Sequence, residues 1–92
     1  MKINDLIGAE LDRAVAIYQN VEINARVIYS PSTQWAQGGP IIERARLELH
    51  NATDRSGEWV AHSDFQIYAF GPTPLIAAMR CYVAAQRLGA AL

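Results

Sequence analysis

Residues 70–89 read FGPTPLIAAMRCYVAAQRLG, and this stretch decides the fold because it carries both ends of a long helix. Thr73 and Pro74 form a start signal: a threonine N-cap accepts from an early backbone N–H, and proline suits the first helical position. Gly89 lies where a glycine commonly closes a helix. The stretch therefore predicts a helix over residues 73–88.

This predicted helix has very little polar surface. Its apolar stripe at helical spacing consists of Leu75, Ile76, Met79, Tyr82 and Val83, and the adjacent faces are filled mainly by alanines and Cys81. A helix so short of polar residues is usually covered on more than one side. Two explanations stay open: part of the helix packs in a homo-oligomer interface, or a sheet and the tail of the same chain bury it.

Composition indicates one globular domain over residues 1–92. Hydrophobic residues make up 51% of the chain and charged residues 18%, so the chain is not of the disordered class. The net charge of −1, with acids and bases interleaved, argues against a nucleic-acid partner. The lone Cys81 forms no intrachain disulfide, which fits a reducing cytoplasm. We expect a cytoplasmic protein without a signal peptide or a membrane span, because no apolar run is long enough for either.

Upstream of the long helix, periodicity predicts a first helix over residues 4–19. Asn4 or Asp5 is expected to cap its start and Asn20 to stop it, with Asp12 among the side chains that face water. The alternative is a later start near Ala9, because Gly8 weakens the first turn.

Strand signals occupy the rest of the chain. Residues 21–29 alternate in part and predict a strand or an extended arm. Residues 46–50 and 59–62, separated by the turn chemistry of 51–57, form the clearest hairpin, and 65–70 alternate as a last strand. These elements predict an α+β fold, an antiparallel sheet of three to four strands with two helices. The alternative is an α/β/α sandwich with helices on both faces.

The most unusual stretch is the segment Tyr29–Glu43, YSPSTQWAQGGPIIE. Pro31 and the hydroxyl residues around it break regular structure, and Pro40 is expected to open a short helix through Glu43. The segment combines aromatic rings, hydroxyls and a helix N-terminus able to receive an anion, so we interpret it as a candidate site. The alternative is a long surface loop whose Trp35 plugs the edge of the core. Walker and GxGxxG phosphate patterns are both absent.

Taken together, the segments YSPSTQWAQGGPIIE and GPTPLIAAMRCYVA resemble the signature blocks of the NinX-like family of small phage and prophage proteins, and LIGAELDRAVA resembles that family's opening helix. The resemblance covers over half of the chain. It implies a phage or prophage accessory protein acting in a bacterial cytoplasm, and it implies no reaction. It places emphasis on Tyr29, Ser30, Pro31, Ser32, Thr33, Trp35, Gln37, Gly38, Gly39, Pro40, Glu43, Thr73, Pro74 and Arg80.

We predict a non-enzymatic, homo-oligomeric binder of a small anionic or nucleotide-like ligand, which would let a phage sequester a host signalling molecule. An aromatic ring would stack on the ligand, glycine amides and hydroxyls would hold a phosphate, and an arginine would add charge. The predicted ligand-binding residues are Tyr29, Ser32, Thr33, Trp35, Gln37, Gly38, Gly39 and Arg80. Arg80 has a second interpretation, as a solvent-facing or salt-bridged side chain. The alternative function is a protein-interaction module that acts on a host or phage protein.

Catalytic, metal and cofactor chemistry are not predicted. His50, His62 and Cys81 are the only His and Cys residues, and they lie on separate predicted elements without HxxxH or CxxC spacing. We expect the two histidines to face outward at strand ends. No GxSxG elbow is present, although a triad assembled in space cannot be read from sequence. The carboxylates of Glu43, Glu48 and Glu58 are expected to be solvated.

Overall fold

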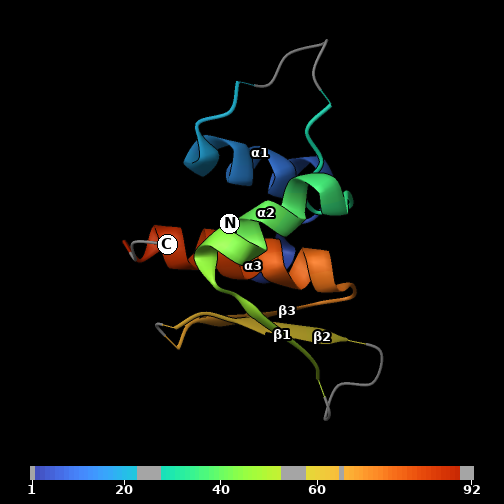
Figure 1. The fold of residues 1–92 in the computed structure, drawn as a ribbon, viewed down its shortest axis with the longest axis vertical. Coiled ribbons are helices and arrows are strands. Elements are labelled where there is room, and N and C mark those ends of the chain that lie inside the picture. Colours follow the sequence, from blue (N-terminus) through green and yellow to red (C-terminus); the bar gives the residue numbers. More distant parts are fainter. Residues whose placement is uncertain (1, 23–27, 53–57, 65, 90–92) are drawn as a thin grey trace.

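The computed structural model describes residues 2–22, 28–52, 58–64 and 66–89, and within them it confirms the α+β class (Figure 1). The elements in order are a 3-10 helix η1 (Ile3–Asp5), α1 (Gly8–Gln19), α2 (Trp35–Ala45), β1 (Glu48–Asn51), β2 (Trp59–His62), β3 (Tyr68–Gly71) and α3 (Pro74–Arg87). The three strands form one antiparallel sheet in the order β1-β2-β3.

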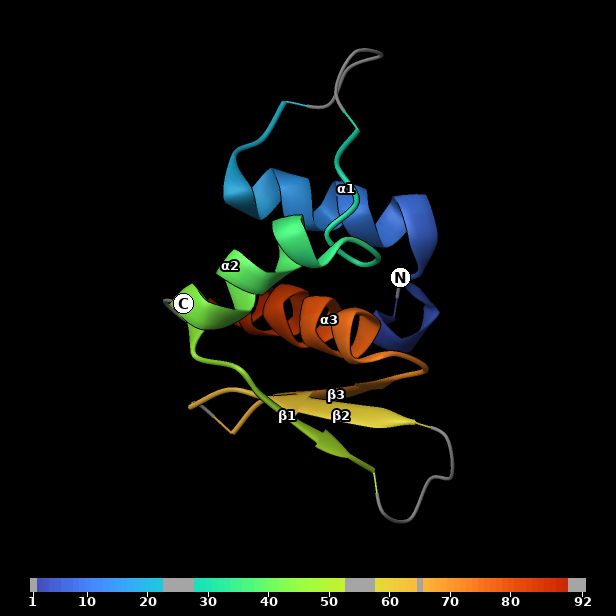
Figure 2. The ribbon, with the colours of Figure 1, turned by 45° about the vertical axis from the view of Figure 1, so that its right-hand side comes forward.

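The elements form layers, with α3 in the middle. One side of α3 packs on the sheet, and α1 and α2 pack on its other side (Figures 1 and 2). All three α-helices therefore lie on the same side of the sheet, and the α/β/α sandwich alternative is wrong. The core lies along α3, where Met79 and Val83 are fully buried together with Leu11 and Val15 of α1.

The predicted long helix is confirmed at both ends. The Thr73 hydroxyl accepts a hydrogen bond from the Ile76 N–H at 3.1 Å, and Pro74 occupies the first helical position. Gly89 follows the helix with φ +77°, and its N–H donates to the Gln86 carbonyl at 3.0 Å. Both apolar sides of α3 are covered within one chain, so a subunit interface is not needed to explain them.

The first predicted helix begins at Gly8, close to the later start near Ala9 that the weak first turn favours, and not at residue 4. Asn4 and Asp5 lie in η1, and the residue that precedes α1 is Ile7, whose side chain makes no capping bond. Asn20 stops the helix as predicted, in the left-handed conformation with φ 58°. The expectation that Asp12 faces water is wrong: it is only 8% exposed, because its carboxylate bonds a backbone N–H.

The predicted hairpin is confirmed, with β1 and β2 as its two strands. Glu48 pairs with His62 and Asn51 with Trp59, and Ala61 is fully buried beneath α3. A fourth strand over 21–29 is not found in the described part, since Val21, Glu22, Ile28 and Tyr29 lie outside any helix or strand. The remainder of that prediction, residues 23–27, and the turn residues 53–57 and Phe65 fall outside the described residues.

The helix that was expected to open at Pro40 starts earlier in the chain. It begins at Trp35, and Pro40 lies inside it. The Gln34 carbonyl accepts from the N–H groups of both Gln37 and Gly38, at 3.0 and 2.9 Å, and this closes the first turn well before the proline. Tertiary packing overrides the helix-breaking tendency of the Gly-Gly-Pro sequence here, because Gly38 and Ile41 are buried against the rest of the chain.

Candidate functional site

The segment that enters α2, residues 28–34, is a tied loop, named here the 28–34 loop. The Gln37 side chain donates to the Ile28 carbonyl at 2.8 Å and accepts from the Ser30 N–H at 2.5 Å. The Gln34 N–H donates to the Ser30 carbonyl at 2.8 Å, which closes a turn. These bonds fix the approach of the loop to the first turn of α2.

A second set of contacts holds the loop from the opposite side. The Ser32 N–H donates to the Asp12 carboxylate of α1 at 2.9 Å, and this bond is buried. Gly38 of α2 lies so close to Pro31 that a Cβ added at Gly38 would meet the Pro31 carbonyl oxygen at 2.4 Å. The loop is therefore pinned between α1 and α2, and it presents a defined surface to α3.

A cavity of about 240 Å³ opens where this loop meets the start of α3; it is named here the α2/α3 cavity. Mostly apolar side chains line it, and they come from two segments far apart in the chain. Its lining residues are Ser32, Thr33, Trp35, Thr73, Pro74, Leu75 and Ile76. Trp35 is 55% exposed, so its ring is available to a ligand at the mouth.

Two helix N-termini meet at this cavity. The first N–H groups of a helix have no partner within it, and in α2 these belong to Trp35 and Ala36. In α3 the capping Thr73 takes the N–H groups of Ile76 and Ala77, which leaves the Leu75 N–H as a donor without a described partner. Both helix dipoles place partial positive charge at these ends, so the site favours a negatively charged group.

The Ser32 hydroxyl adds a polar group inside the lining. Ser32 is 1% exposed, and its Oγ is the buried side-chain oxygen that finds no hydrogen-bond partner in the described part of the chain. Buried hydroxyls in proteins are almost always hydrogen-bonded, so an unpaired hydroxyl on a residue that lines a cavity is a candidate donor to a ligand.

A neighbouring hollow of about 430 Å³ lies on the other side of the 28–34 loop, between the loop and α1, and Thr33 borders both hollows. Tyr29, Asp12 and Arg13 are among the residues that line it. Burial raises the pKa of the Tyr29 hydroxyl, helped by Tyr82 and Asp12 and opposed by Arg44. Tyr29 thus stays close to the site without lining the α2/α3 cavity.

The remaining predicted site residues occupy structural positions. Gln37 ties the loop, and Gly38 is buried in α2 with its N–H already donated to Gln34. Gly39 lies in the same helix with open space beside its Cα. Arg80 is buried, and its guanidinium donates to the carbonyls of Leu6 and Phe70, each at 2.9 Å, while the α2/α3 cavity is lined without it.

Two parts of the site were missed by sequence reasoning. Asp12 was interpreted as solvent-facing, and no local pattern links it to a loop 20 residues away. The Thr73–Ile76 turn was identified as a helix start, and its place beside Trp35 becomes visible only when the two segments meet in the fold.

None of the helices in the described residues is long and apolar enough to cross a membrane. A comparison with curated proteins found no match. A family model described as "Bacteriophage P22, NinX" matches residues 17–86, which include the 28–34 loop, α2, the whole sheet and nearly all of α3. The chain therefore belongs to the NinX family of bacteriophage proteins.

Proposed function

We propose that this NinX-family protein is a non-enzymatic phage or prophage accessory protein that binds a small ligand carrying an anionic group and a planar ring, such as a nucleotide. The observation that supports the proposal is the α2/α3 cavity, where the exposed Trp35, two helix N-termini and the unpaired Ser32 hydroxyl lie together. The ring would stack on Trp35, and the anionic group would accept from backbone N–H groups and the hydroxyl.

The charge and size of the cavity restrict the class of ligand that we expect. No cationic side chain lines it among the described residues, and Arg80 is occupied by backbone carbonyls. At about 240 Å³ the cavity is also smaller than the roughly 300–1,000 Å³ of common ligand sites. We therefore expect a ligand with one phosphate or carboxylate, of which only part enters the cavity, in preference to a di- or triphosphate.

The proposal is tested by calorimetry and by fluorescence of a Trp59→Phe variant, which leaves Trp35 as the reporter. Titration with mono-, di- and cyclic nucleotides should give a saturable signal with the monophosphates, and adenosine and inorganic phosphate alone should bind more weakly. Trp35→Ala and Ser32→Ala should each weaken binding. Absence of heat and of a fluorescence change across the whole set would refute the proposal.

In a phage-infected cell such binding would act in the host cytoplasm and would sequester a host signalling nucleotide. This extension depends on the ligand proposal. It predicts that adding the protein lowers the free concentration of a cyclic or mononucleotide signal in proportion to the number of cavities, with no product formed. Turnover of the nucleotide would contradict the non-enzymatic part.

A protein-interaction module is the second candidate, because the lining of the cavity is mostly apolar and Ile28, the first residue of the 28–34 loop, is 82% exposed. An exposed tryptophan beside an apolar hollow also suits the anchor side chain of a partner protein. Capture of a host or phage protein by the wild type and its loss with Trp35→Ala, in a preparation that binds no nucleotide, would favour this function.

Self-association is a separate part of the proposal. Because α3 is covered within one chain, a subunit contact would have to use exposed apolar side chains elsewhere, such as Ile17 at 71% and Tyr18 at 39% exposure on α1. Light scattering of the wild type and an Ile17→Ser variant tests this: a multimer that Ile17→Ser dissociates supports it, and a monomeric wild type excludes it.

A further inference from the structure

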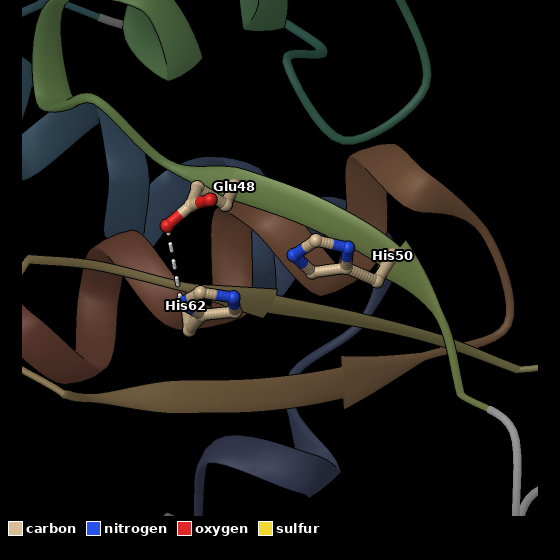
Figure 3. Close-up of side chains that lie close together, drawn as sticks. All are labelled: Glu48, His50 and His62. Atoms are coloured by element: carbon tan, nitrogen blue, oxygen red, sulfur yellow. Dashed lines mark ion pairs between the residues drawn. The ribbon is translucent and has the colours of Figure 1, made fainter.

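The second feature that points to a ligand is the face of the sheet opposite α3. Side chains alternate across a strand, so Glu48 and His50, two residues apart in β1, project from the same face. In β2, His62 lies directly opposite Glu48 and diagonal to His50. Figure 3 shows the three side chains gathered on one surface, which the described helices leave uncovered.

The three side chains are close enough to act together. His62 Nδ1 lies 3.7 Å from Glu48 Oε2, and the two imidazole rings stack with centroids 5.0 Å apart and an interplanar angle of 11°. One ligand atom from each residue falls within 4.8 Å of the others. In a tetrahedral zinc site, bonds of roughly 2.0–2.1 Å place ligand atoms somewhat more than 3 Å apart. Turning the exposed His50 ring out of the stack and moving the exposed Glu48 carboxylate would bring the three donor atoms together around one ion.

We propose that Glu48, His50 and His62 bind one divalent transition-metal ion, with Zn²⁺ as the representative, on the open face of the β1–β2 hairpin. Two imidazoles and one carboxylate form the donor set that borderline metals prefer, whereas Ca²⁺ and Mg²⁺ prefer oxygen ligands alone. The remaining coordination positions face solvent.

The sequence did not predict this site because no metal-binding spacing is present. His50 and His62 belong to different strands, and only the antiparallel register brings them together. The sole cysteine, Cys81, is buried in α3 and donates to the Ile67 carbonyl, so it is already engaged within the core. The site is also separate from the α2/α3 cavity, which none of the three residues lines.

Binding would link β1 to β2 across the sheet. An ion that binds the folded hairpin and not the unfolded chain stabilises the protein by mass action. We therefore expect Zn²⁺ to raise the thermal midpoint of the wild type, and to leave that of a His62→Gln variant unchanged.

The test uses the full chain without an affinity tag. Calorimetric titration with Zn²⁺ should show one ion per chain, and Co²⁺ should give the visible absorption of a nitrogen- and oxygen-ligated site. His50→Gln and His62→Gln should each weaken Zn²⁺ binding by more than about tenfold, since even outer-shell partners are worth 10–100-fold. Glu48→Gln should weaken it as well.

Two matched controls isolate the site. Glu10→Gln removes an exposed carboxylate on α1, and Cys81→Ser removes the thiol, and neither should change Zn²⁺ affinity. Circular dichroism confirms that each variant is folded. The proposal is overturned if the wild type shows no saturable Zn²⁺ binding, or if His62→Gln binds as tightly as the wild type. In that outcome the Glu48–His62 contact is a surface ion pair only.

Discussion

Gly38 and Gly39 are adjacent in α2, yet their surroundings differ. An added Cβ at Gly38 would lie 2.4 Å from the Pro31 carbonyl oxygen and 2.7 Å from Leu75 Cδ2, whereas a Cβ at Gly39 would point into open space. Gly38 therefore allows α2, the 28–34 loop and α3 to approach one another, and its contribution to the site is packing.

We expect Gly38→Ala to lower the free energy of unfolding by about 1–3 kcal/mol, because a rigid backbone carbonyl must move. Gly39→Ala should change it by less than about 0.5 kcal/mol: the gain in helix propensity is offset by crowding against the following Pro40. Urea unfolding followed by tryptophan fluorescence compares the two. Equal losses of unfolding free energy in the two variants would show that the close approach at Gly38 does not determine the stability at this position.

Arg80 is the buried cation of α3, and it joins the end of η1 to β3 through two carbonyl oxygens. We expect Arg80→Lys to lower stability by about 2–4 kcal/mol, because a single ammonium group cannot reproduce the arginine fork and charged hydrogen bonds are worth about 1.5–3 kcal/mol each. Chemical unfolding measures the loss, with exposed Arg13→Lys as control.

The same variant separates a structural role from a ligand-binding one. If Arg80 holds the fold, folded Arg80→Lys should bind nucleotide as the wild type does. A large loss of affinity at unchanged stability would instead return Arg80 to the site, as the sequence-based prediction had it.

The buried thiol of Cys81 should make the stability of the protein depend on pH in the alkaline range. Burial raises the pKa of its thiol from 9.0 to about 11. The folded state therefore favours the neutral thiol. The associated stability is fully present below pH 9 and is lost as the pH rises through about 11, by up to about 3 kcal/mol.

The measurement is the free energy of unfolding at several pH values between 8 and 11 for the wild type and Cys81→Ser. Both chains contain the same tyrosines, so the difference in pH dependence belongs to the thiol. The wild type should lose more stability than the variant; parallel curves would contradict a buried, neutral thiol.

Among the helices and strands, the sequence predicted best those whose own residues mark their boundaries or faces. The helix α3 has a capping threonine, a proline at its first position and a closing glycine, and the structure shows all three in those roles. In the β1–β2 hairpin, Leu49 and Ala61 were predicted to share one face and Glu48, His50 and His62 the other, and the strand pairing agrees with this.

The start of α2 was not predictable, because its cause is tertiary. Gln37 braces the preceding loop and Gly38 fits against Pro31, and these contacts stabilise a helical turn that the sequence Gly-Gly-Pro would not favour alone. The first helix begins at Gly8 with φ +59° and without a side-chain cap, so the predicted cap at Asn4 or Asp5 is wrong, whereas the weak first turn at Gly8 was visible in the sequence.

The hydrogen bond between Asp12 and the Ser32 N–H joins α1 to the 28–34 loop. Asp12→Ala leaves the Ser32 N–H without its acceptor and should cost about 1–3 kcal/mol, as expected for a buried donor left unpaired. Asp12→Asn keeps an acceptor oxygen and should cost less.

Thermal unfolding gives the ranking, and calorimetry with a mononucleotide shows whether loosening the loop also weakens binding. Exposed Asp5→Ala serves as the control. Equal stability of Asp12→Ala and the wild type would mean that the loop is held by its other contacts alone.

In the whole molecule, the sheet covers one side of α3, and α1 and α2 cover its other side (Figure 2). This layered arrangement explains, within one chain, why α3 has so few polar residues. Sequence could show that α3 needed cover on more than one side. It could not show that two other helices of the same chain supply that cover, because the periodicity of a helix indicates which of its faces are buried and not which elements bury them.

The sequence predicted part of the geometry of the candidate site. Ser32, Thr33 and Trp35 do line one cavity, and Tyr29 lies beside it. The opposite wall of the cavity, the Thr73–Ile76 turn, comes from a distant segment of the chain. Gly38 was expected to supply a phosphate-binding amide and Arg80 a positive charge. Both instead donate hydrogen bonds to backbone carbonyls of the same chain.

The most direct test of the binding claim is an amide chemical-shift titration of ¹⁵N-labelled protein with a nucleoside monophosphate. We predict saturable shifts in the Ser32–Ala36 and Leu75–Ala77 amides, absent in Trp35→Ala, with the amides of β1 and β2 unmoved. A spectrum that does not change at millimolar nucleotide, or shifts confined to another surface, would contradict the assignment of the α2/α3 cavity as the ligand site.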